Sequence, residues 1–251
     1  MIPKEEWDKF WLKSQANQKL VRRELQSSRF KLIRSILEEK FGSLSQLEII
    51  EIGSGMGNGA LALAISGAKP TLLDYSELAL EKAASFFQLC GLKPKLINCD
   101  VFQASQQITE KFDVCLSFDL AEHFTGEERW KIIEAHFNLI KEGGMVIIAV
   151  PNRFCLPYLV AKWIRKWQEI PFTKSELKDI AQKMDAQDIA IYGCSLIAFI
   201  NALIAGLLGM VVKKLKQVSL IPDVRLGFLD SYFGYALLLI ASRRASKVAK
   251  D

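Results

Sequence analysis

Three glycines at alternate positions follow an apolar run, with an acidic residue two positions before the first. The segment is Glu51-Ile-Gly53-Ser-Gly55-Met-Gly57, and the helical run Ala60–Ile65 comes after it. Glycines allow a tight turn here, and they let backbone N–H groups approach a ligand closely. A dinucleotide fingerprint would need its third glycine at position 58, where this chain has Asn58. The spacing therefore indicates a ligand-binding loop of another kind, and a purely structural tight turn is the alternative.

Acidic residues stand where three further apolar runs end. They are Asp74 after Thr71–Leu73, Asp100 shortly after Leu96–Ile97, and Asp119 after Val114–Phe118. A carboxylate can accept two hydrogen bonds from a cis-diol, so Asp74 is a candidate ribose clamp. The alternatives are structural: Asp74 as a helix N-cap beside Ser76, and Asp100 as a loop cap.

The chain has two histidines, and they occupy different contexts. His123 comes just past the run that ends at Phe118, so it is a candidate general base that titrates in the useful pH range. A hydrogen-bonded structural histidine is the alternative for His123. His136 lies inside a helical stretch, and we predict a surface or satisfied-core residue.

Alternating strands and helices must position these residues. The predicted strands are Leu47–Ile52, Thr71–Leu73, Leu96–Ile97, Val114–Phe118, Met145–Val150 and Ala236–Ser242. The predicted helices are residues 16–40, Ser76–Leu89 and Gly126–Ile140, the last opened by a Thr125/Glu128 capping box and closed by Gly143-Gly144. This alternation predicts a parallel sheet wrapped by helices.

Composition and charge are those of an intracellular globular protein. The 251 residues are 50% hydrophobic and 24% charged, which is enough for a sizeable core. The charged Met1–Ser14 stretch is not a secretory signal, and five scattered cysteines do not suggest a disulfide scaffold. Residues 51–150 hold 8 Lys or Arg against 13 Asp or Glu, a balance of −5 that suits a cationic ligand.

The glycine loop and the motifs after it resemble the class I S-adenosylmethionine-dependent methyltransferases, whose first motif is E/D-x-G-x-G-x-G. In that family, the residue matching Asp74 binds both ribose hydroxyls, and the one matching Asp100 faces the adenine amino group. The segment from Asp119 to Phe124 matches the region close to the methionine moiety, and Lys141-Glu-Gly143-Gly144 matches the turn before the fifth strand. The resemblance covers about residues 45–152 plus the last strand.

The resemblance implies an α/β fold with a Rossmann-like seven-stranded sheet. The sheet is expected to be mostly parallel with an antiparallel last strand, with helices on both faces and helical lid insertions. Residues 1–251 would form a single methyltransferase domain. Its parts would be an N-terminal helical cap (1–45), a cofactor-binding core (46–152), a lid or insert region (153–235) and the final strand (236–242).

The implied cofactor is S-adenosylmethionine, with S-adenosylhomocysteine as the product. Tyr75 is expected to stack near the adenine, and His123 is the expected catalytic residue. The full set of expected cofactor-binding residues is Glu51, Gly53, Ser54, Gly55, Gly57, Asp74, Tyr75, Asp100, Val101 and Asp119.

The implied function is in-line methyl transfer to a small, rather lipophilic acceptor at O, N or C. One alternative is a metal-assisted O-methyltransferase of a quinone-type phenol at the membrane surface. Asp119-x-x-Glu122-His123 resembles the E-x-x-E-H metal cluster of ubiquinone-biosynthesis O-methyltransferases, but with Asp in place of the first Glu. We therefore predict no metal ligands. The other alternative is a non-catalytic cofactor-binding partner subunit. No nucleic-acid partner is expected, because no aromatic–basic RNA module is recognisable.

Two segments of the insert region bear on acceptor and partners. Trp163 and Trp167, among Lys162, Arg165 and Lys166, form either a lid or mouth for an anionic substrate, or a helix that packs its aromatics on the core. Residues 194–212 contain no charge over 19 positions. They are expected to be a lid, a homodimer face or a peripheral membrane contact. A spanning helix would put the last two strands on opposite sides of the membrane. The expected location is the cytoplasm, with peripheral membrane contact left open.

Overall fold

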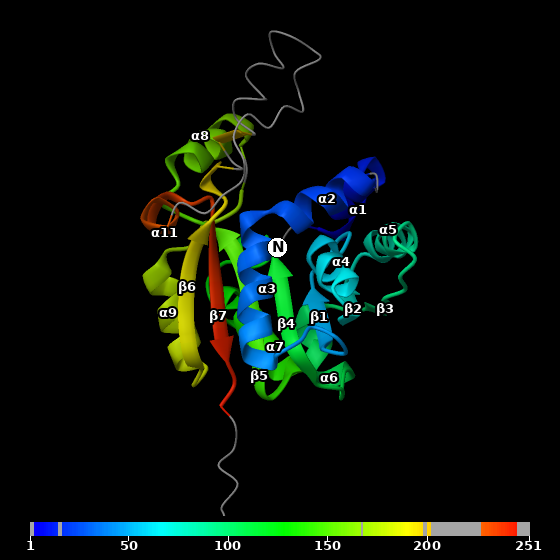
Figure 1. Ribbon diagram of the computed structural model, residues 1–251. Helices are drawn as coiled ribbons and strands as arrows, with labels where there is room; N and C mark the ends of the chain where they lie inside the picture. The colour runs from blue at the N-terminus through cyan, green and yellow to red at the C-terminus, as the bar shows by residue number, and fades with distance from the viewer. Residues whose placement is uncertain (1–2, 15–16, 167, 198–199, 202–226, 245–251) are drawn as a thin grey trace, which may run out of the picture.

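The computed structural model describes residues 3–14, 17–166, 168–197, 200–201 and 227–244 (Figure 1). The elements in chain order are α1 (Lys4–Lys13), α2 (Gln18–Gln26), α3 (Ser28–Phe41), β1 (Glu48–Ile52), α4 (Asn58–Ile65), β2 (Lys69–Asp74), α5 (Glu77–Gln88), β3 (Lys95–Asn98), η1 (Val101–Gln103), α6 (Ala104–Gln107), β4 (Phe112–Phe118), η2 (Ala121–His123), α7 (Glu128–Leu139), β5 (Ile140–Pro151), α8 (Leu156–Arg165), α9 (Lys174–Lys183), β6 (Gln187–Cys194), α11 (Phe228–Phe233) and β7 (Ala236–Ser242).

Seven strands of the described chain form one sheet in the order β3-β2-β1-β4-β5-β7-β6. Strands β1 to β5 pair in parallel, whereas β7 runs antiparallel to both of its neighbours, β5 and β6. The order reverses between β1 and β4, so the loops after these strands lie side by side at the carboxyl edge of the sheet, where doubly wound sheets bind their ligands. The predicted fold class, with its antiparallel last strand, is confirmed.

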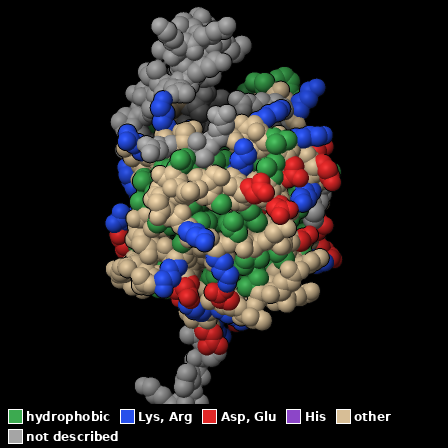
Figure 2. Space-filling view, turned by 90° about the vertical axis from the view of Figure 1, so that its right-hand side faces the viewer, with side chains coloured by type: hydrophobic (Ala, Val, Ile, Leu, Met, Phe, Trp, Pro, Cys, Tyr) green, Lys and Arg blue, Asp and Glu red, His purple; other side chains and the backbone are tan. Residues whose placement is uncertain are grey.

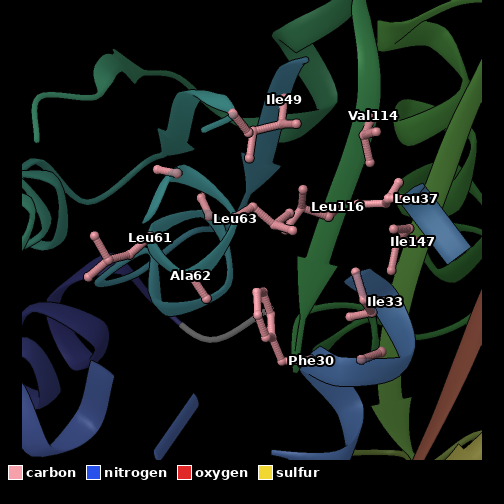
Figure 3. Packing of buried hydrophobic residues seen from close by; sticks show 14 of the residues in the cluster. Phe30, Ile33, Leu37, Ile49, Leu61, Ala62, Leu63, Val114, Leu116 and Ile147 are labelled. Atoms are coloured by element: carbon pink, nitrogen blue, oxygen red, sulfur yellow. The ribbon is translucent and has the colours of Figure 1, made fainter. Parts of the chain in front are cut away.

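Helices cover both faces of the sheet, each over its own hydrophobic cluster. On one face, α2 to α5 pack on the sheet; Figure 3 shows Phe30, Ile33 and Leu37 of α3 directed toward the neighbourhood of Leu116 and Ile147. On the other face, apolar residues of α7 and α9 pack against the opposite side of the same strands. Burial on both faces explains why the strands read as continuous apolar runs rather than alternating patterns.

The N-terminal region differs from the prediction of one long helix over residues 16–40. The chain breaks at Ser27, which has extended backbone and whose hydroxyl accepts a hydrogen bond from Phe30 N (3.0 Å). Ser27 therefore caps α3 and ends α2, because serine competes for backbone groups at helix ends. An additional helix, α1, precedes these two in the part predicted only as a helical cap.

The predicted capping box before α7 is wrong. Gly126 has φ +54°, a turn conformation that a helix cannot include, so Thr125 lies outside the helix. The N-cap is Glu127, which makes no side-chain cap bond. Gly143 and Gly144 do not end the helix either: α7 stops at Leu139 and both glycines belong to β5. A Cβ on Gly144 would lie 3.1 Å from Asp113 O, so glycine allows close strand packing there.

The predicted insert region contributes one strand that the apolar runs did not locate. β6 forms the edge of the sheet beyond β7, and α9 covers it. Most of residues 194–212, expected to be a lid, dimer face or membrane contact, lie outside the described residues. Among the residues that are described, no helix combines the length and apolarity needed to cross a membrane.

His136 is a satisfied core histidine, one of the two predicted outcomes. It is fully buried, and its ring nitrogens lie 2.8 Å from Ile132 O and 2.8 Å from Ser117 Oγ. Burial disfavours the charged imidazolium and lowers the pKa of His136 to about 4.

The stability contributed by His136 should therefore depend on pH. Below about pH 6.5 the unfolded chain binds a proton at this residue, but the folded chain does so only near pH 4. The free energy of unfolding of the wild type should fall across this window, and His136→Gln should lack that part of the decrease. Thermal unfolding of both proteins from about pH 7 to 4.5 should show their Tm difference narrowing. A constant difference would contradict a neutral buried His136.

Candidate active site

The glycine loop connects β1 to α4 at the carboxyl edge of the sheet. Its three glycines have positive φ: 58° at Gly53, 50° at Gly55 and 67° at Gly57, where α4 begins. L-residues rarely adopt this conformation, so the alternating glycine spacing predicted from sequence is a backbone requirement. The loop also excludes side-chain atoms: a Cβ on Gly55 would lie 2.4 Å from Cη2 of Trp11.

Glu51, in β1 just before the loop, holds the first turn of α4 in place. Its side chain is buried, and Oε2 accepts a hydrogen bond from Ala60 N in the first turn of α4 (2.7 Å). Burial raises the pKa of Glu51 to about 8, although the bond from Ala60 opposes that shift. Glu51 thus fixes the helix N-terminus relative to the strand end.

Asp74 joins the glycine loop to the end of β2. Its Oδ2 accepts a hydrogen bond from Gly55 N (2.8 Å), and its Oδ1 accepts one from Ser76 N (2.9 Å). The side chain is buried, and burial raises the pKa of Asp74 despite these bonds. The N-cap role, the structural alternative for Asp74, is instead filled by Ser76, whose hydroxyl accepts from Ala79 N.

Backbone bonds bring the end of β3 beside Asp74. Asn98 Nδ2 and Cys99 N both donate to Asp74 O (3.1 Å each). Asp100 then caps η1 by accepting from Phe102 N (2.9 Å). The capping alternative for Asp100 is therefore realised.

Two predicted cofactor residues flank these strand ends. Val101, the first residue of η1, is buried. Tyr75 is half-buried, and burial together with the charges of Asp74 and Asp8 raises the pKa of its hydroxyl. The strand ends thus bring together Asp74, Tyr75, Asp100 and Val101, as the resemblance implies.

Three residues after β4, Asp119, Glu122 and His123, lie at the same carboxyl edge of the sheet. Asp119 has φ 54°, and burial together with the Glu169 charge raises the pKa of its carboxyl, while Arg29 lowers it. Glu122 is 1% exposed, and burial and the charge of Asp119 raise its pKa well above the ordinary value. Within the described residues, Glu122 Oε2, His123 Nδ1 and Ser54 Oγ are buried atoms without a hydrogen-bond partner.

Helix α1 lies over this edge, which the sequence did not predict. Asp8 accepts a short hydrogen bond from the Ser76 hydroxyl, and Trp11 packs on Gly55. The Trp7 ring makes an edge contact with His123, with 5.0 Å between ring centroids. The aromatic residues clustered in the first turns of α1 were the only available sequence signal.

Arg29 of α3 also lies at this edge, and the sequence analysis did not single it out. Its guanidinium pairs with Glu24 (3.0 Å) and lies 4.5 Å from the centroid of the Phe118 ring. Its charge also lowers the pKa values of Glu51 and Asp119. It thus places a positive charge among the carboxylates of the strand ends.

The segment after α8 packs against the residues that follow β4. Ile170 N donates to Glu122 O (2.8 Å), and Tyr158 donates its hydroxyl proton to Glu169 Oε2 (2.8 Å). The Tyr158 and Tyr235 rings contact each other at 5.5 Å. The Glu169 charge therefore acts on His123, and the two tyrosines stand close to the carboxylates of Glu122 and Glu169.

The residues of the proposed metal motif do not form a metal site. Asp119, Glu122 and His123 follow one another after β4, but in the part of the chain that is described no three His, Cys, Asp or Glu side chains gather as ion ligands could. The metal-assisted alternative therefore has no geometric support.

The fold is a Rossmann-like sheet whose carboxyl edge carries a glycine loop and acidic strand ends. Residues 49–144 match the family model described as a methyltransferase domain. This match assigns the segment a likeness to methyltransferase domains, and it covers less than half of the chain.

Curated relatives and solved structures agree with this assignment. A ubiquinone biosynthesis O-methyltransferase of Rickettsia felis is 26% identical over 144 residues, covering 55% of this chain and 57% of the relative. One of Dechloromonas aromatica is 29% identical over 119 residues, covering 47% and 50%. The chain thus matches only about half the length of these relatives.

Two solved structures share the fold over nearly the whole chain. The magnesium protoporphyrin IX methyltransferase of Synechocystis PCC 6803, with bound S-adenosylhomocysteine, has a TM-score of 0.62 and 19% identity and covers 95% of this chain and 93% of its own. A SAM-dependent methyltransferase of Thermotoga maritima has a TM-score of 0.60 and 16% identity, covering 96% and 95%.

Proposed function

We propose that this protein is an S-adenosylmethionine-dependent methyltransferase that modifies a small, lipophilic acceptor. The observation that carries the proposal is the coupling of Asp74 to Gly55 N at the same edge as the buried, unpartnered Glu122 and His123 atoms. One half of the edge is shaped to hold a nucleoside, and the other half offers polar atoms to a reacting group.

The loop and strand ends fit the cofactor. The glycine backbone leaves room for close approach, and the buried Ser54 hydroxyl has no hydrogen-bond partner in the described part of the chain. Asp74 can accept hydrogen bonds from both ribose hydroxyls with its remaining lone pairs. When bound, S-adenosylmethionine supplies a methyl group activated by its positive sulfonium.

Charge at the edge suits the two ends of such a cofactor. Arg29 is the cation among the strand-end carboxylates and is suited to hold the cofactor's own carboxylate. Asp119 provides negative charge near the position expected for the sulfonium. Because Trp11 packs on Gly55, a ligand on the loop must share that space with the indole or displace it.

His123 is placed to take a proton from the acceptor. Burial lowers its pKa, so the imidazole is neutral and able to accept a proton at pH 7. The Trp7 ring packs beside it and restricts access of water from the α1 side. Glu122 and Glu169 lie next to it, and Tyr158 and Tyr235 form the adjoining wall.

A proton-accepting role for His123 predicts a specific pH profile. The rate should rise with pH through an apparent pKa below about 6.5 and then level off, because the imidazole must be deprotonated. His123→Ala should lower the rate by roughly 10²-fold and leave S-adenosylhomocysteine affinity unchanged. Initial rates between about pH 5 and 9 test this. An unchanged rate in the variant would assign His123 a structural role.

Methyl transfer itself is tested by product release. The full chain is incubated with S-adenosylmethionine and a panel of lipophilic phenols, amines and carboxylates, and S-adenosylhomocysteine is quantified. Release that depends on one acceptor class supports the proposal and identifies the atom methylated. Tight S-adenosylhomocysteine binding with no release on any acceptor would favour the non-catalytic partner subunit instead.

A further inference from the structure

Helix α8 carries apolar side chains on both of its sides. Its inner side is packed on the protein: Cys155 and Tyr158 are fully buried, and Ala161 is nearly so. Its outer side exposes Leu156, Val160, Trp163 and Ile164, with Trp163 81% and Ile164 65% exposed. These four have the i, i+4, i+7, i+8 spacing of one helical face. A helix that only needed to cover a core would place polar residues there, so the prediction that Trp163 packs on the core is wrong.

Helix α11 extends this surface at the same end of the molecule (Figure 1). Its exposed side chains are Phe228, Leu229, Tyr232 and Phe233. The Tyr158 ring of α8 contacts the ring of Tyr235, which comes just after α11. The outer apolar residues of α8 and α11 are called the apical surface below.

The helices of the apical surface are fixed to the body of the protein. Asn152 Nδ2 donates to Tyr232 O (2.9 Å) and Gly234 O (3.0 Å). Lys162 donates to Glu169 O, and Lys174 donates to the Ser231 hydroxyl (2.6 Å). The apolar side chains are therefore presented outward by bonded helices rather than by a frayed segment.

The charged residues of α8 are basic, and Glu169 beyond the helix is half-buried and accepts a hydrogen bond from Tyr158. Residues 153–166 include four Lys or Arg and no Asp or Glu. The single acid of α11, Asp230, is fully buried and accepts from Leu196 N (3.0 Å). A hollow of about 710 Å³ on α8 is lined by Leu159, Trp163 and Ile164 together with Lys162 and Lys166. Exposed tryptophan and aliphatic residues beside lysines are typical of helices that lie in a bilayer interface.

We propose that the apical surface docks on an anionic lipid bilayer, with Trp163 and Ile164 entering the interface and the exposed Lys166 facing lipid phosphates. A second copy of the chain is disfavoured as the occupant, because pairing two apical surfaces would bring like charges together. The surface is separate from the cofactor loop, so this proposal stands or falls independently of methyl transfer.

Vesicle sedimentation of the full chain tests the proposal. Binding is measured to phosphatidylcholine vesicles and to vesicles with about one quarter phosphatidylglycerol, at low and high salt. We expect at least tenfold tighter binding to the anionic vesicles, weakened by salt. Trp163→Ser with Ile164→Ser should reduce that binding at least tenfold, and Lys166→Gln should reduce the preference for phosphatidylglycerol.

A matched control uses exposed apolar residues at the other end of the sheet. Leu89 and Leu96 lie at the α5 and β3 side, the face shown in Figure 2, where acidic and basic side chains are interspersed. Leu89→Ser with Leu96→Ser should leave vesicle binding unchanged. S-adenosylhomocysteine affinity should be equal in all variants.

Three results would overturn the proposal. They are absence of binding to anionic vesicles, equal loss of binding in the control pair, and a dimer by light scattering that Trp163→Ser with Ile164→Ser dissolves. The last result would assign the surface to a second copy of the chain.

Discussion

Asp74→Ala should weaken S-adenosylhomocysteine binding by at least about 100-fold, roughly 3 kcal/mol. The substitution removes the carboxylate proposed to hold the ribose. It also removes the acceptor for Gly55 N and Ser76 N, which shape the loop around the ligand. Asp74→Asn should lie between the wild type and Asp74→Ala, because the amide oxygen can replace only one of the two acceptors.

Isothermal titration of S-adenosylhomocysteine into each protein measures this effect. Asp179→Ala is the matched control, because Asp179 is an exposed aspartate on α9 on the far side of the sheet from the loop. Its affinity should equal that of the wild type. Equal affinities of Asp74→Ala and wild type, with both proteins folded, would remove Asp74 from the site.

Gly193→Ala should destabilise the protein by about 3 kcal/mol, which lowers Tm by roughly 6–12 °C for a chain of this size. Gly193 lies in β6, and a Cβ there would stand 1.6 Å from Asp230 O and 2.9 Å from Ser231 Cα. These are backbone atoms, so the clash can be relieved only by moving α11 off the strand.

Gly126→Ala is the control for this second substitution. Gly126 has φ +54°, and a Cβ there would meet no atom within 4 Å. The free energy of unfolding of that variant should therefore fall by only roughly 1–2 kcal/mol, the cost of placing an L-residue in the left-handed conformation. Thermal unfolding that gives Gly193→Ala the same or a smaller loss than Gly126→Ala would contradict the close packing of α11 on β6.

The meeting of the residues proposed to hold the cofactor could be predicted, because they follow strands in a fixed order. In a parallel sheet the carboxyl ends of strands meet at one edge, so Gly55, Asp74 and Asp100 come together once the strands are recognised. The seven-stranded sheet was expected from the resemblance, but β6 was not located in the sequence, since it is an edge strand with polar positions and does not stand out as an apolar run.

The helices that pack over the glycine loop, and the residues around His123, could not be predicted in the same way. Trp11 and Arg29 come from helices that carry no motif, and their positions depend on how those helices pack over the loop. Glu169 reaches Tyr158 only through the path of the segment after α8. Local spacing contains no information on such contacts, because they are set by tertiary packing.

Thermal unfolding with S-adenosylhomocysteine, with NAD as the control ligand, tests the central claim most directly. At about 100 times Kd a ligand of the folded state adds roughly 2.7 kcal/mol, or about 5–11 °C in Tm. We predict such a shift with S-adenosylhomocysteine and none with NAD. No shift with S-adenosylhomocysteine, or a shift with NAD alone, would contradict a methyltransferase cofactor site at the Gly53–Gly57 loop.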